Sequence, residues 1–290
     1  MKISVIVITR NEGAELRRTV ENLQSTLPSR SELIVVNDGS RGRIADLPRP
    51  RRIIHTRSLG HAQSLGVARA RNLGASRSTG DLLVFADAHI RLDADWWRPL
   101  ALVLENPKAG AASPAVTHLP PVKTLGYGLT FKGADLEVAW LPKKAGRPFR
   151  VPIVPGCCLA MRRDTFNAIG GWDSGLLHRG GVDNEMSIRM WTLGYDLYVD
   201  PRVVCRHLFR QKSPYHVGWP EYLHNRLRLA MAHLSAPRIA QVVAALQHHR
   251  AFGAAMALAV ENGITERRRE MRERRVRTDN QYFARFGIRW

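Results

Sequence analysis

The chain has 290 residues and a mass of 32.6 kDa, which predicts one large domain with an added lobe rather than two full-sized domains. Hydrophobic residues make up 44% and charged residues 24% of the sequence, and this composition excludes a disordered or fibrous chain. Lysine and arginine outnumber aspartate and glutamate by 44 to 25, a formal net charge of +19. Such a charge fits nucleic acid, an anionic membrane surface or a phosphorylated small molecule as partner, beside a plain solvated basic surface.

Cysteine content and apolar runs bear on the compartment. The three cysteines, Cys157, Cys158 and Cys205, cannot all pair, and adjacent cysteines rarely bridge each other. No apolar run approaches the ~20 residues of a membrane span, and the N-terminus opens on a strand-like run rather than a secretory signal. We therefore expect a cytoplasmic protein with reduced thiols.

The first 116 residues alternate between strand-like and helix-like segments. We predict strands at 3–8, 33–36, 52–55 and 82–86, and helices at 11–27 and 61–76. Such alternation is typical of an α/β fold with a mostly parallel sheet and helices on both faces. Ligands of such sheets bind beyond the carboxyl ends of the strands.

The pattern changes after residue 116. Residues 117–150 are rich in proline, glycine and lysine, and we expect an irregular excursion with a short hairpin. The segments that follow are predicted as strands at 151–161 and 197–205, a helix at 183–193, and helices from 215 onward, one starting at Pro237 and one running from 251 to 277. The charge pattern of 266–277 predicts that the last of these is exposed to solvent.

The sharpest local signal is Asp87-Ala88-His89 at the end of a buried strand. In an extended segment, residues two apart point to the same side, so the carboxylate and the imidazole can share one ligand. An oxygen and an imidazole nitrogen suit Mn²⁺ or a similar divalent ion. The alternative is that Asp87 only caps a turn at the strand end.

Several further segments match sequence motifs of a known enzyme family. Thr9-Arg10-Asn11-Glu12 after the first strand, followed by Leu33-Ile-Val-Val-Asn-Asp-Gly-Ser40, resembles the nucleotide-binding half of family 2 glycosyltransferases, which have the GT-A fold. Gly66-Val-Ala-Arg-Ala-Arg-Asn-Leu-Gly-Ala75 matches their third landmark, and Gly80-Asp-Leu-Leu-Val-Phe-Ala-Asp-Ala-His89 matches their metal motif. The histidine in that motif is characteristic of the polypeptide N-acetylgalactosaminyltransferases.

A second block extends this closer similarity. Gly180-Gly181, Glu185, Ser187, Arg189 and Trp191 reproduce the spacing of a segment of that family, and His207-Leu208-Phe209-Arg210 with Ser213-Pro214-Tyr215 resembles its His-Val-Phe-Arg run. The resemblance covers residues 1–116 and 151–216. It implies a GT-A domain over 1–215, with a nucleotide-sugar half at 1–116 and an acceptor half at 117–215, followed by a helical C-terminal extension at 216–290.

The resemblance also implies a donor site for a UDP-sugar and a bound Mn²⁺ or Mg²⁺. The metal ligands would be Asp87, His89 and His207. The residues expected to contact the nucleotide sugar lie in the matched segments: Thr9, Glu12, Asp38, Arg69, Arg71, Asp87, Arg210 and Tyr215. Asp38 can accept the imide N–H of uracil or a ribose hydroxyl, or it can serve an Asx turn that needs no ligand. Of Arg69 and Arg71, we expect one only to pair with carboxylates or face solvent.

The inverting family 2 enzymes and the retaining N-acetylgalactosaminyltransferases differ at the position of the catalytic carboxylate. Inverting family 2 enzymes carry Glu-Asp at the start of the short helix, whereas the retaining N-acetylgalactosaminyltransferases carry Glu-Asn. This chain has Val182-Asp183 there. Since a single displacement needs a carboxylate opposite the leaving group, Asp183 is the expected general base of an inverting enzyme. Asp183 can also cap the helix, and Glu185 is the alternative base.

The acceptor is less defined by the sequence. Trp172, Asp173 and Glu185 are expected on the acceptor side, where the Trp172 face would stack on a sugar or apolar group or simply pack in the core. His178 and Arg179 stand where the resembled enzymes often have tryptophan, which speaks against a peptide. A glycan, a peptide and a natural product all stay open as acceptors.

The arginine-rich segment 266–277 has interleaved glutamates, such as Glu270 four residues before Arg274, and these favour a salt-bridged solvated helix. Docking on an anionic membrane and gripping an anionic acceptor are the functional alternatives. Sparse aromatic residues argue against stacking on single-stranded nucleic acid, so no nucleic-acid partner is expected. The competing hypotheses are a retaining N-acetylgalactosaminyltransferase-like enzyme acting on a peptide and a non-catalytic nucleic-acid-binding protein.

Overall fold

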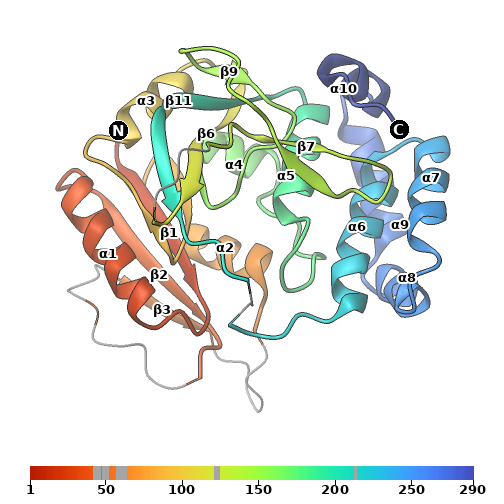
Figure 1. Cartoon of the computed structure of the whole chain (residues 1–290), viewed down its shortest axis with the longest axis horizontal. Coiled ribbons are helices and arrows are strands. Elements are labelled where there is room, and N and C mark those ends of the chain that lie inside the picture. Colours follow the sequence, from red (N-terminus) through yellow and green to blue (C-terminus); the bar gives the residue numbers. More distant parts are fainter. Residues whose placement is uncertain (42–46, 48–51, 57–63, 121–124, 212–213) are drawn as a thin grey trace.

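A mixed β-sheet forms the centre of the computed structural model, which describes residues 1–41, 47, 52–56, 64–120, 125–211 and 214–290 (Figure 1). Within these residues the strand order is β3-β2-β1-β4-β10-β6-β11-β5, with β9 paired to β11. The strands are β1 (Ile3–Thr9), β2 (Glu32–Asp38), β3 (Arg52–Thr56), β4 (Leu82–Asp87), β5 (Ile90–Arg91), β6 (Ala109–His118), β9 (Phe149–Arg150), β10 (Cys158–Arg162) and β11 (Asp196–His207). The predicted mostly parallel sheet is confirmed, because β3, β2, β1 and β4 pair in parallel, as do β6 and β11. The antiparallel pairings are those of β10 with β4 and β6, and of β5 and β9 with β11.

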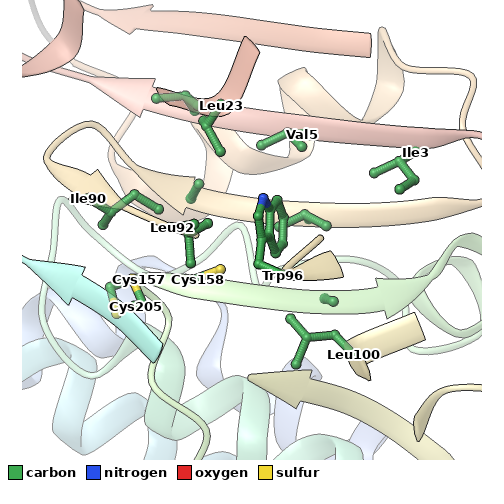
Figure 2. Close-up of a cluster of buried hydrophobic side chains, with 14 of the residues drawn as sticks. Ile3, Val5, Leu23, Ile90, Leu92, Trp96, Leu100, Cys157, Cys158 and Cys205 are labelled. Carbon is green, nitrogen blue, oxygen red and sulfur yellow. The ribbon is translucent and has the colours of Figure 1, made fainter. Parts of the chain in front are cut away.

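Strand β1 shows why the sheet is buried on both sides. Val5 and Val7 pack in one hydrophobic cluster and Ile6 in another, because alternate residues of a strand face opposite sides. The first cluster lies under α1 (Ala14–Thr26) and α3 (Trp97–Val103), and Figure 2 shows Leu23 of α1 close to Val5. The second lies under α2 (Val67–Ser76), α4 (Arg163–Ala168) and α5 (Val182–Thr192). The expected helices on both faces are therefore present.

The three cysteines lie in the first cluster (Figure 2). Cys157, Cys158 and Cys205 are free and buried. Their sulfur atoms act as small apolar groups in the packing, as expected for Cys157 and Cys158.

The excursion between β6 and β10 contains the expected hairpin. Strands β7 (Leu129–Phe131) and β8 (Val138–Trp140) pair antiparallel, and Leu129 forms a bridge with Ile153. Parts of the sequence predictions lie outside the described residues, among them 121–124 of the predicted excursion, the start of the 61–76 helix, and Ser213. The described part of that helix begins at Val67.

The C-terminal extension is a group of five helices within the described residues: α6 (Trp219–His233), α7 (Ala236–Leu246), α8 (Phe252–Glu261), α9 (Ile264–Arg274) and α10 (Asp279–Phe286). The single helix predicted over 251–277 is wrong, because Gly263 adopts a left-handed conformation, φ 67°, that ends α8 before α9. None of the helices in the described ranges combines the length and the apolar character that crossing a membrane requires.

A third hydrophobic cluster joins this extension to the sheet domain. Ile153 and Ile188 of the sheet domain pack with Leu227 of α6 and with Phe283 of α10. The Trp191 ring meets the Tyr282 ring edge-on at 5.3 Å between centroids. The extension and the sheet domain therefore share this third cluster.

Candidate functional site

Polar side chains from three neighbouring parallel strands meet at one edge of the sheet. Thr9 ends β1, Asp38 ends β2 and Asp87 ends β4. Because β1 pairs in parallel with both β2 and β4, these carboxyl ends are brought side by side. All three residues line a cavity of about 380 Å³. The expectation of a site beyond the strand ends therefore matches a real cavity.

Asp87, His89 and His207 come together in this cavity. One ligand atom from each lies within 4.8 Å of those of the others. The His207 Nε2 atom is 3.3 Å from Asp87 Oδ2, and the two imidazole centroids are 4.7 Å apart. The pairing of β5 with β11 places His207 opposite Ile90, and this pairing carries His207 to the strand end from a distant part of the sequence.

Neighbouring charges shift the pKa values of Asp87 and His89 in opposite directions. Burial raises the pKa of Asp87, but the hydrogen bond from His207 and the charges of His89 and Arg71 outweigh it and lower the pKa well below its usual range. Burial lowers the pKa of His89, but Glu12, 3.1 Å from its Nδ1, and Asp87 outweigh it and raise the pKa. Arg210 Nη2 donates to the same Glu12 carboxylate at 2.5 Å.

Asp183 reaches the cavity from the first turn of α5. Its Oδ1 accepts a hydrogen bond from Arg71 Nη1 at 3.1 Å, and its Oδ2 accepts one from the Gly156 backbone N–H at 3.1 Å. Burial raises the pKa of Asp183, and although Arg71 opposes this shift, the neighbouring Asp87 charge supports it. Gly181 is the N-cap of α5 and the helix has no side-chain cap. Asp183 therefore does not cap the helix, which was its alternative interpretation.

Of the other residues expected to contact the donor, all but Arg69 line the cavity. Asp38 accepts the backbone N–H of Leu65 at 2.6 Å and of Gly66 at 3.0 Å, and its carboxylate still lines the cavity. Arg210 and Tyr215 also line it. Arg71 lines the cavity, but Arg69 does not, because its Nε donates to the Ser174 carbonyl at 2.7 Å on the outer side of α2. Arg69 is thus the arginine that does not line the cavity.

The structure corrects the acceptor-side expectations. Trp172 is 1% exposed and lies beneath the Arg71 guanidinium, 4.4 Å from its ring centroid. Asp173 and Glu185 are also buried, and none of the three lines the cavity. Trp172 thus packs in the core and supports Arg71, and its face is not available for stacking on an acceptor.

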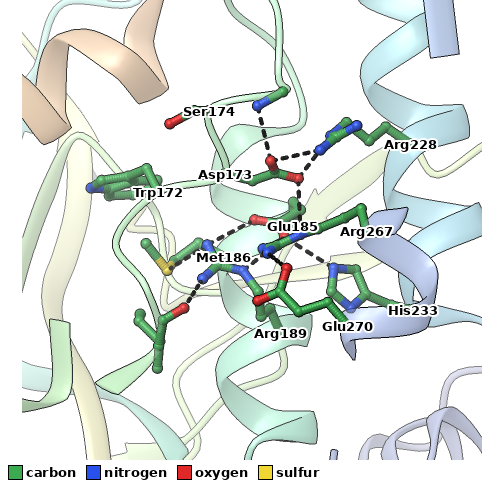
Figure 3. Close-up of polar contacts among 12 residues, drawn as sticks. Trp172, Asp173, Ser174, Glu185, Met186, Arg189, Arg228, His233, Arg267 and Glu270 are labelled. Carbon is green, nitrogen blue, oxygen red and sulfur yellow. Dashed lines mark hydrogen bonds and ion pairs between the residues drawn. The ribbon is translucent and has the colours of Figure 1, made fainter. Parts of the chain in front are cut away.

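Glu185 and Asp173 belong to a buried ion network (Figure 3). Arg189 binds both carboxylate oxygens of Glu185, at 2.8 and 3.1 Å, and His233 Nε2 is 2.9 Å from Oε1. Burial raises the pKa of Glu185, but Arg189 and His233 outweigh it and lower the pKa far below its usual range. Because both oxygens are engaged in the interior, Glu185 is excluded as the general base.

Arg267 of α9 connects the two acids. Its Nε is 3.5 Å from Asp173 Oδ2, and its Nη2 is 3.6 Å from Glu185 Oε1. Arg228 of α6 binds Asp173 through two nitrogens, at 2.8 and 2.9 Å. The expectation that α9 is only a solvated helix is therefore wrong for the face that carries Arg267, because the Arg267 side chain is 13% exposed.

Among the cavity residues that the sequence reasoning did not assign to the site are Arg10, Arg179 and Phe209. Phe209 stands inside the quoted His-Leu-Phe-Arg run, so its position was a usable signal. Arg10 lies beside Thr9 and Glu12, and its guanidinium stacks 4.7 Å from the Tyr215 ring centroid. Arg179 was noted beside His178 as a departure from the resembled enzymes, but nothing in the sequence indicated that its side chain lines the cavity.

Known proteins of similar sequence include polypeptide N-acetylgalactosaminyltransferases. Over 168 residues the chain is 36% identical to polypeptide N-acetylgalactosaminyltransferase 11 of Xenopus tropicalis, covering 53% of this chain and 28% of that protein. Human polypeptide N-acetylgalactosaminyltransferase 15 is 31% identical over 248 residues, covering 78% of this chain and 39% of that protein. The chain spans less than half the length of these curated relatives.

A solved structure shows the same fold. The crystal structure of GalNAc-T7 with UDP, GalNAc and Mn²⁺ superposes with a TM-score of 0.77 at 19% identity, covering 99% of this chain and 57% of that one. The expected GT-A fold is thereby confirmed. Residues 4–170 match the family described as Glycosyl transferase family 2. The chain therefore belongs to the family 2 glycosyltransferases.

Proposed function

We propose that this protein transfers a sugar from a UDP-sugar to an acceptor hydroxyl, with a divalent metal ion and with inversion at the anomeric carbon. The observation that carries the proposal is the meeting of Asp87, His89 and His207 in one cavity with Asp183. Support comes from the UDP, GalNAc and Mn²⁺ named for the superposed GalNAc-T7 structure.

The residues fit a metal ion. Two imidazoles and a carboxylate are a donor set that suits Mn²⁺. The His207 Nε2 atom lies 3.3 Å from Asp87 Oδ2, and His89 offers a ring nitrogen within 4.8 Å of both ligand atoms, so the three side chains can share one ion. When bound, the ion would neutralise charge on the departing nucleotide diphosphate.

The protein's own residues would hold the donor in an extended pose across the cavity. Thr9 and Asp38 lie at the end expected to take the nucleoside. Arg210 and Tyr215 would cover the diphosphate and exclude water, which would otherwise hydrolyse the activated sugar. Glu12 keeps Arg210 over the cavity through their contact at 2.5 Å. We propose that residues 1–116 supply most donor contacts and 117–215 the acceptor side.

Asp183 would take the proton from the acceptor hydroxyl. Arg71 and the Gly156 N–H each hold one carboxylate oxygen, so the carboxylate is oriented before the acceptor arrives. The raised pKa of Asp183, caused by burial and the Asp87 charge, makes this carboxylate a stronger base than one in water. A base on the face opposite the leaving group is the requirement for inversion.

The decisive test of the metal assignment is UDP binding with and without EDTA. We expect Mn²⁺ to tighten UDP binding at least tenfold in the wild-type protein, and Asp87→Ala to abolish that gain. Asp93→Ala is the matched control, because Asp93 is an exposed acid that pairs with Arg206 at 2.8 Å. Equal UDP affinity with EDTA and with Mn²⁺ would refute the metal site.

The general base is tested by Asp183→Asn. Because the amide cannot take a proton, we expect kcat to fall by about 10²–10⁴-fold. UDP affinity in the presence of Mn²⁺ should stay within threefold, since Asp183 is not placed on the nucleotide. Wild-type kcat in this variant would remove Asp183 from the base role.

Retention on a peptide acceptor is the second candidate, and the specific observation in its favour is the identity to polypeptide N-acetylgalactosaminyltransferases. Against it stands Val182-Asp183 at the place where the resembled enzymes have Glu-Asn. The NMR spectrum of the anomeric proton in early product decides between them. Retained configuration, or transfer of N-acetylgalactosamine to a serine or threonine peptide, would favour this second candidate.

A further inference from the structure

A second and larger cavity adjoins the one described above. It has a volume of about 970 Å³ and shares Arg10, Arg179, Pro214 and Tyr215 with the first cavity. Of the residues that the proposed function assigns to the donor, the metal or the base, Tyr215 is the one that also lines this second cavity. The second cavity therefore has no role in the reaction as proposed so far.

The lining of the second cavity is electropositive. The described lining contains three arginines, Arg10, Arg41 and Arg179. Glu137 is the one acidic side chain in that lining. Glu137 is itself ion-paired with Arg226 of α6, so its charge is compensated. The Arg10 Nε atom is buried and has no hydrogen-bond partner among the described residues, although Nη1 donates to Ser64 at 2.8 Å. A buried guanidinium N–H without a partner favours a negatively charged ligand.

An exposed aromatic side chain lies on the same cavity. Trp219, at the start of α6, is 53% exposed. Its indole is fixed by Tyr222, with 5.9 Å between ring centroids, and by His249, with 4.8 Å. A fixed and exposed indole is a surface on which the apolar face of a sugar ring can stack at low entropic cost.

We propose that the second cavity binds the acceptor, and that this acceptor is a negatively charged sugar or glycan. Trp219 would stack on a ring, and Arg10 and Arg41 would bind a phosphate or carboxylate group. Acceptor contacts would then extend beyond residues 117–215, to the donor half and to the start of α6. Arg179 lines both cavities and lies in the loop just before α5, whose first turn carries Asp183, so the second cavity adjoins the one that Asp183 lines. The inference rests on the proposed function for the direction of transfer, but the charge preference follows from this cavity alone.

The test is a binding titration by NMR with glucose 6-phosphate, glucose and inorganic phosphate as probes. Saturating UDP and Mn²⁺ are present, so the donor site is filled. We expect glucose 6-phosphate to bind at least tenfold tighter than glucose and than inorganic phosphate, because only this probe offers both a ring and a charge. Equal affinity for glucose and glucose 6-phosphate would overturn the proposal.

Two variants locate the binding. Arg41→Ala and Trp219→Ala should each weaken glucose 6-phosphate binding at least fivefold and leave UDP affinity unchanged. Arg250→Ala is the matched control, because Arg250 is exposed between α7 and α8 and outside the cavity lining. Unchanged glucose 6-phosphate binding in both variants, or a parallel loss of UDP affinity in both, would overturn the assignment.

The two proposals fail in different ways. If the wild-type protein shows no Mn²⁺-dependent UDP binding, the proposed function fails. The same titration without nucleotide then still measures the preference of the cavity for the charged probe, and Arg41→Ala and Trp219→Ala still report whether that probe occupies it.

Discussion

Gly156 illustrates how a single residue sets the position of the proposed base. A Cβ atom at Gly156 would lie 1.9 Å from Asp183 Oδ1 and 2.3 Å from its Cγ. The backbone N–H of Gly156 donates to Asp183, and its carbonyl accepts from Arg71 Nη2 at 2.8 Å. The absence of a side chain thus lets the backbone approach the carboxylate closely.

Gly156→Ala should therefore displace the Asp183 carboxylate. We expect kcat to fall by about 10²-fold or more, as for loss of a general base, while Mn²⁺-dependent UDP binding persists. Gly146→Ala is the matched control, because a Cβ there meets no atom within 4 Å. Equal kcat values for the two variants, measured on the same UDP-sugar, would show that this close contact does not position the base.

At the scale of elements, helix α9 is fastened to α5 and α6 through buried charge. Arg267 bridges Asp173 and Glu185, and its Nη1 also donates to Glu270 at 2.7 Å. The same α5 carries Asp183 in its first turn. The network therefore fixes the helix on which the proposed base stands.

Arg267→Ala should lower the free energy of unfolding by about 2 kcal/mol. Removing one member of a buried ion network is strongly destabilising, but Asp173 and Glu185 keep Arg228 and Arg189, which moderates the loss. Arg269→Ala, an exposed position on the same helix, should change it by less than about 0.5 kcal/mol. Urea unfolding of the three proteins measures both effects, and equal stability of the two variants would contradict the network's role.

The same network predicts a pH dependence of stability. The pKa of Glu185 is far below its usual range in the folded protein, since Arg189 and His233 outweigh the effect of burial. The unfolded state therefore takes up a proton first as pH falls, and the stabilisation present above about pH 4.3 is lost progressively below it.

For this one carboxyl the loss should reach about 1 kcal/mol by pH 3.5. Glu185→Gln removes the titrating group, so its stability should fall less steeply than that of the wild type between pH 6 and pH 3.5. Urea unfolding at several pH values measures the two slopes. Identical slopes would mean that Glu185 does not contribute to acid sensitivity.

At the scale of the whole molecule, the C-terminal helices complete the core of the sheet domain. Ile188 and Trp191 of α5 pack against α6 and α10 in the third cluster. The Tyr282 hydroxyl donates to the Pro152 carbonyl at 2.9 Å. The helical extension thus covers apolar side chains of the domain that contains the site.

A chain shortened to residues 1–217 should consequently not fold cooperatively. It would expose the α5 face of the third cluster and leave Asp173 without Arg228 and Arg267. We expect binding of a hydrophobic dye and no sigmoidal urea transition, in contrast to the full chain. A cooperative transition of the short chain with Mn²⁺-dependent UDP binding would show that the sheet domain is independent.

Much of the arrangement could be predicted because it rests on local signals. The β-branched run of β1 and the Asn-Asp-Gly-Ser turn after β2 mark strands and their ends within a few residues. The helix break at Gly263 was missed, because a lone glycine inside a helical pattern does not by itself end a helix. The Arg-rich composition of α9 suggested solvent exposure, and its distant acidic partners could not be read from that segment.

The sequence by itself determined strands β1, β2 and β4 and the polar residues at their carboxyl ends, because strand periodicity and turn chemistry act over short distances. Thr9, Asp38 and Asp87 could therefore be placed at one sheet edge before any coordinates. The sequence did not predict β6, a central strand at Ala109–His118. Only the tertiary structure decided that Arg71 rather than Arg69 faces the cavity and that Trp172 and Glu185 are interior. These outcomes depend on packing and ion pairs between segments far apart in the chain, where a side chain's partner, more than its own type, sets its direction.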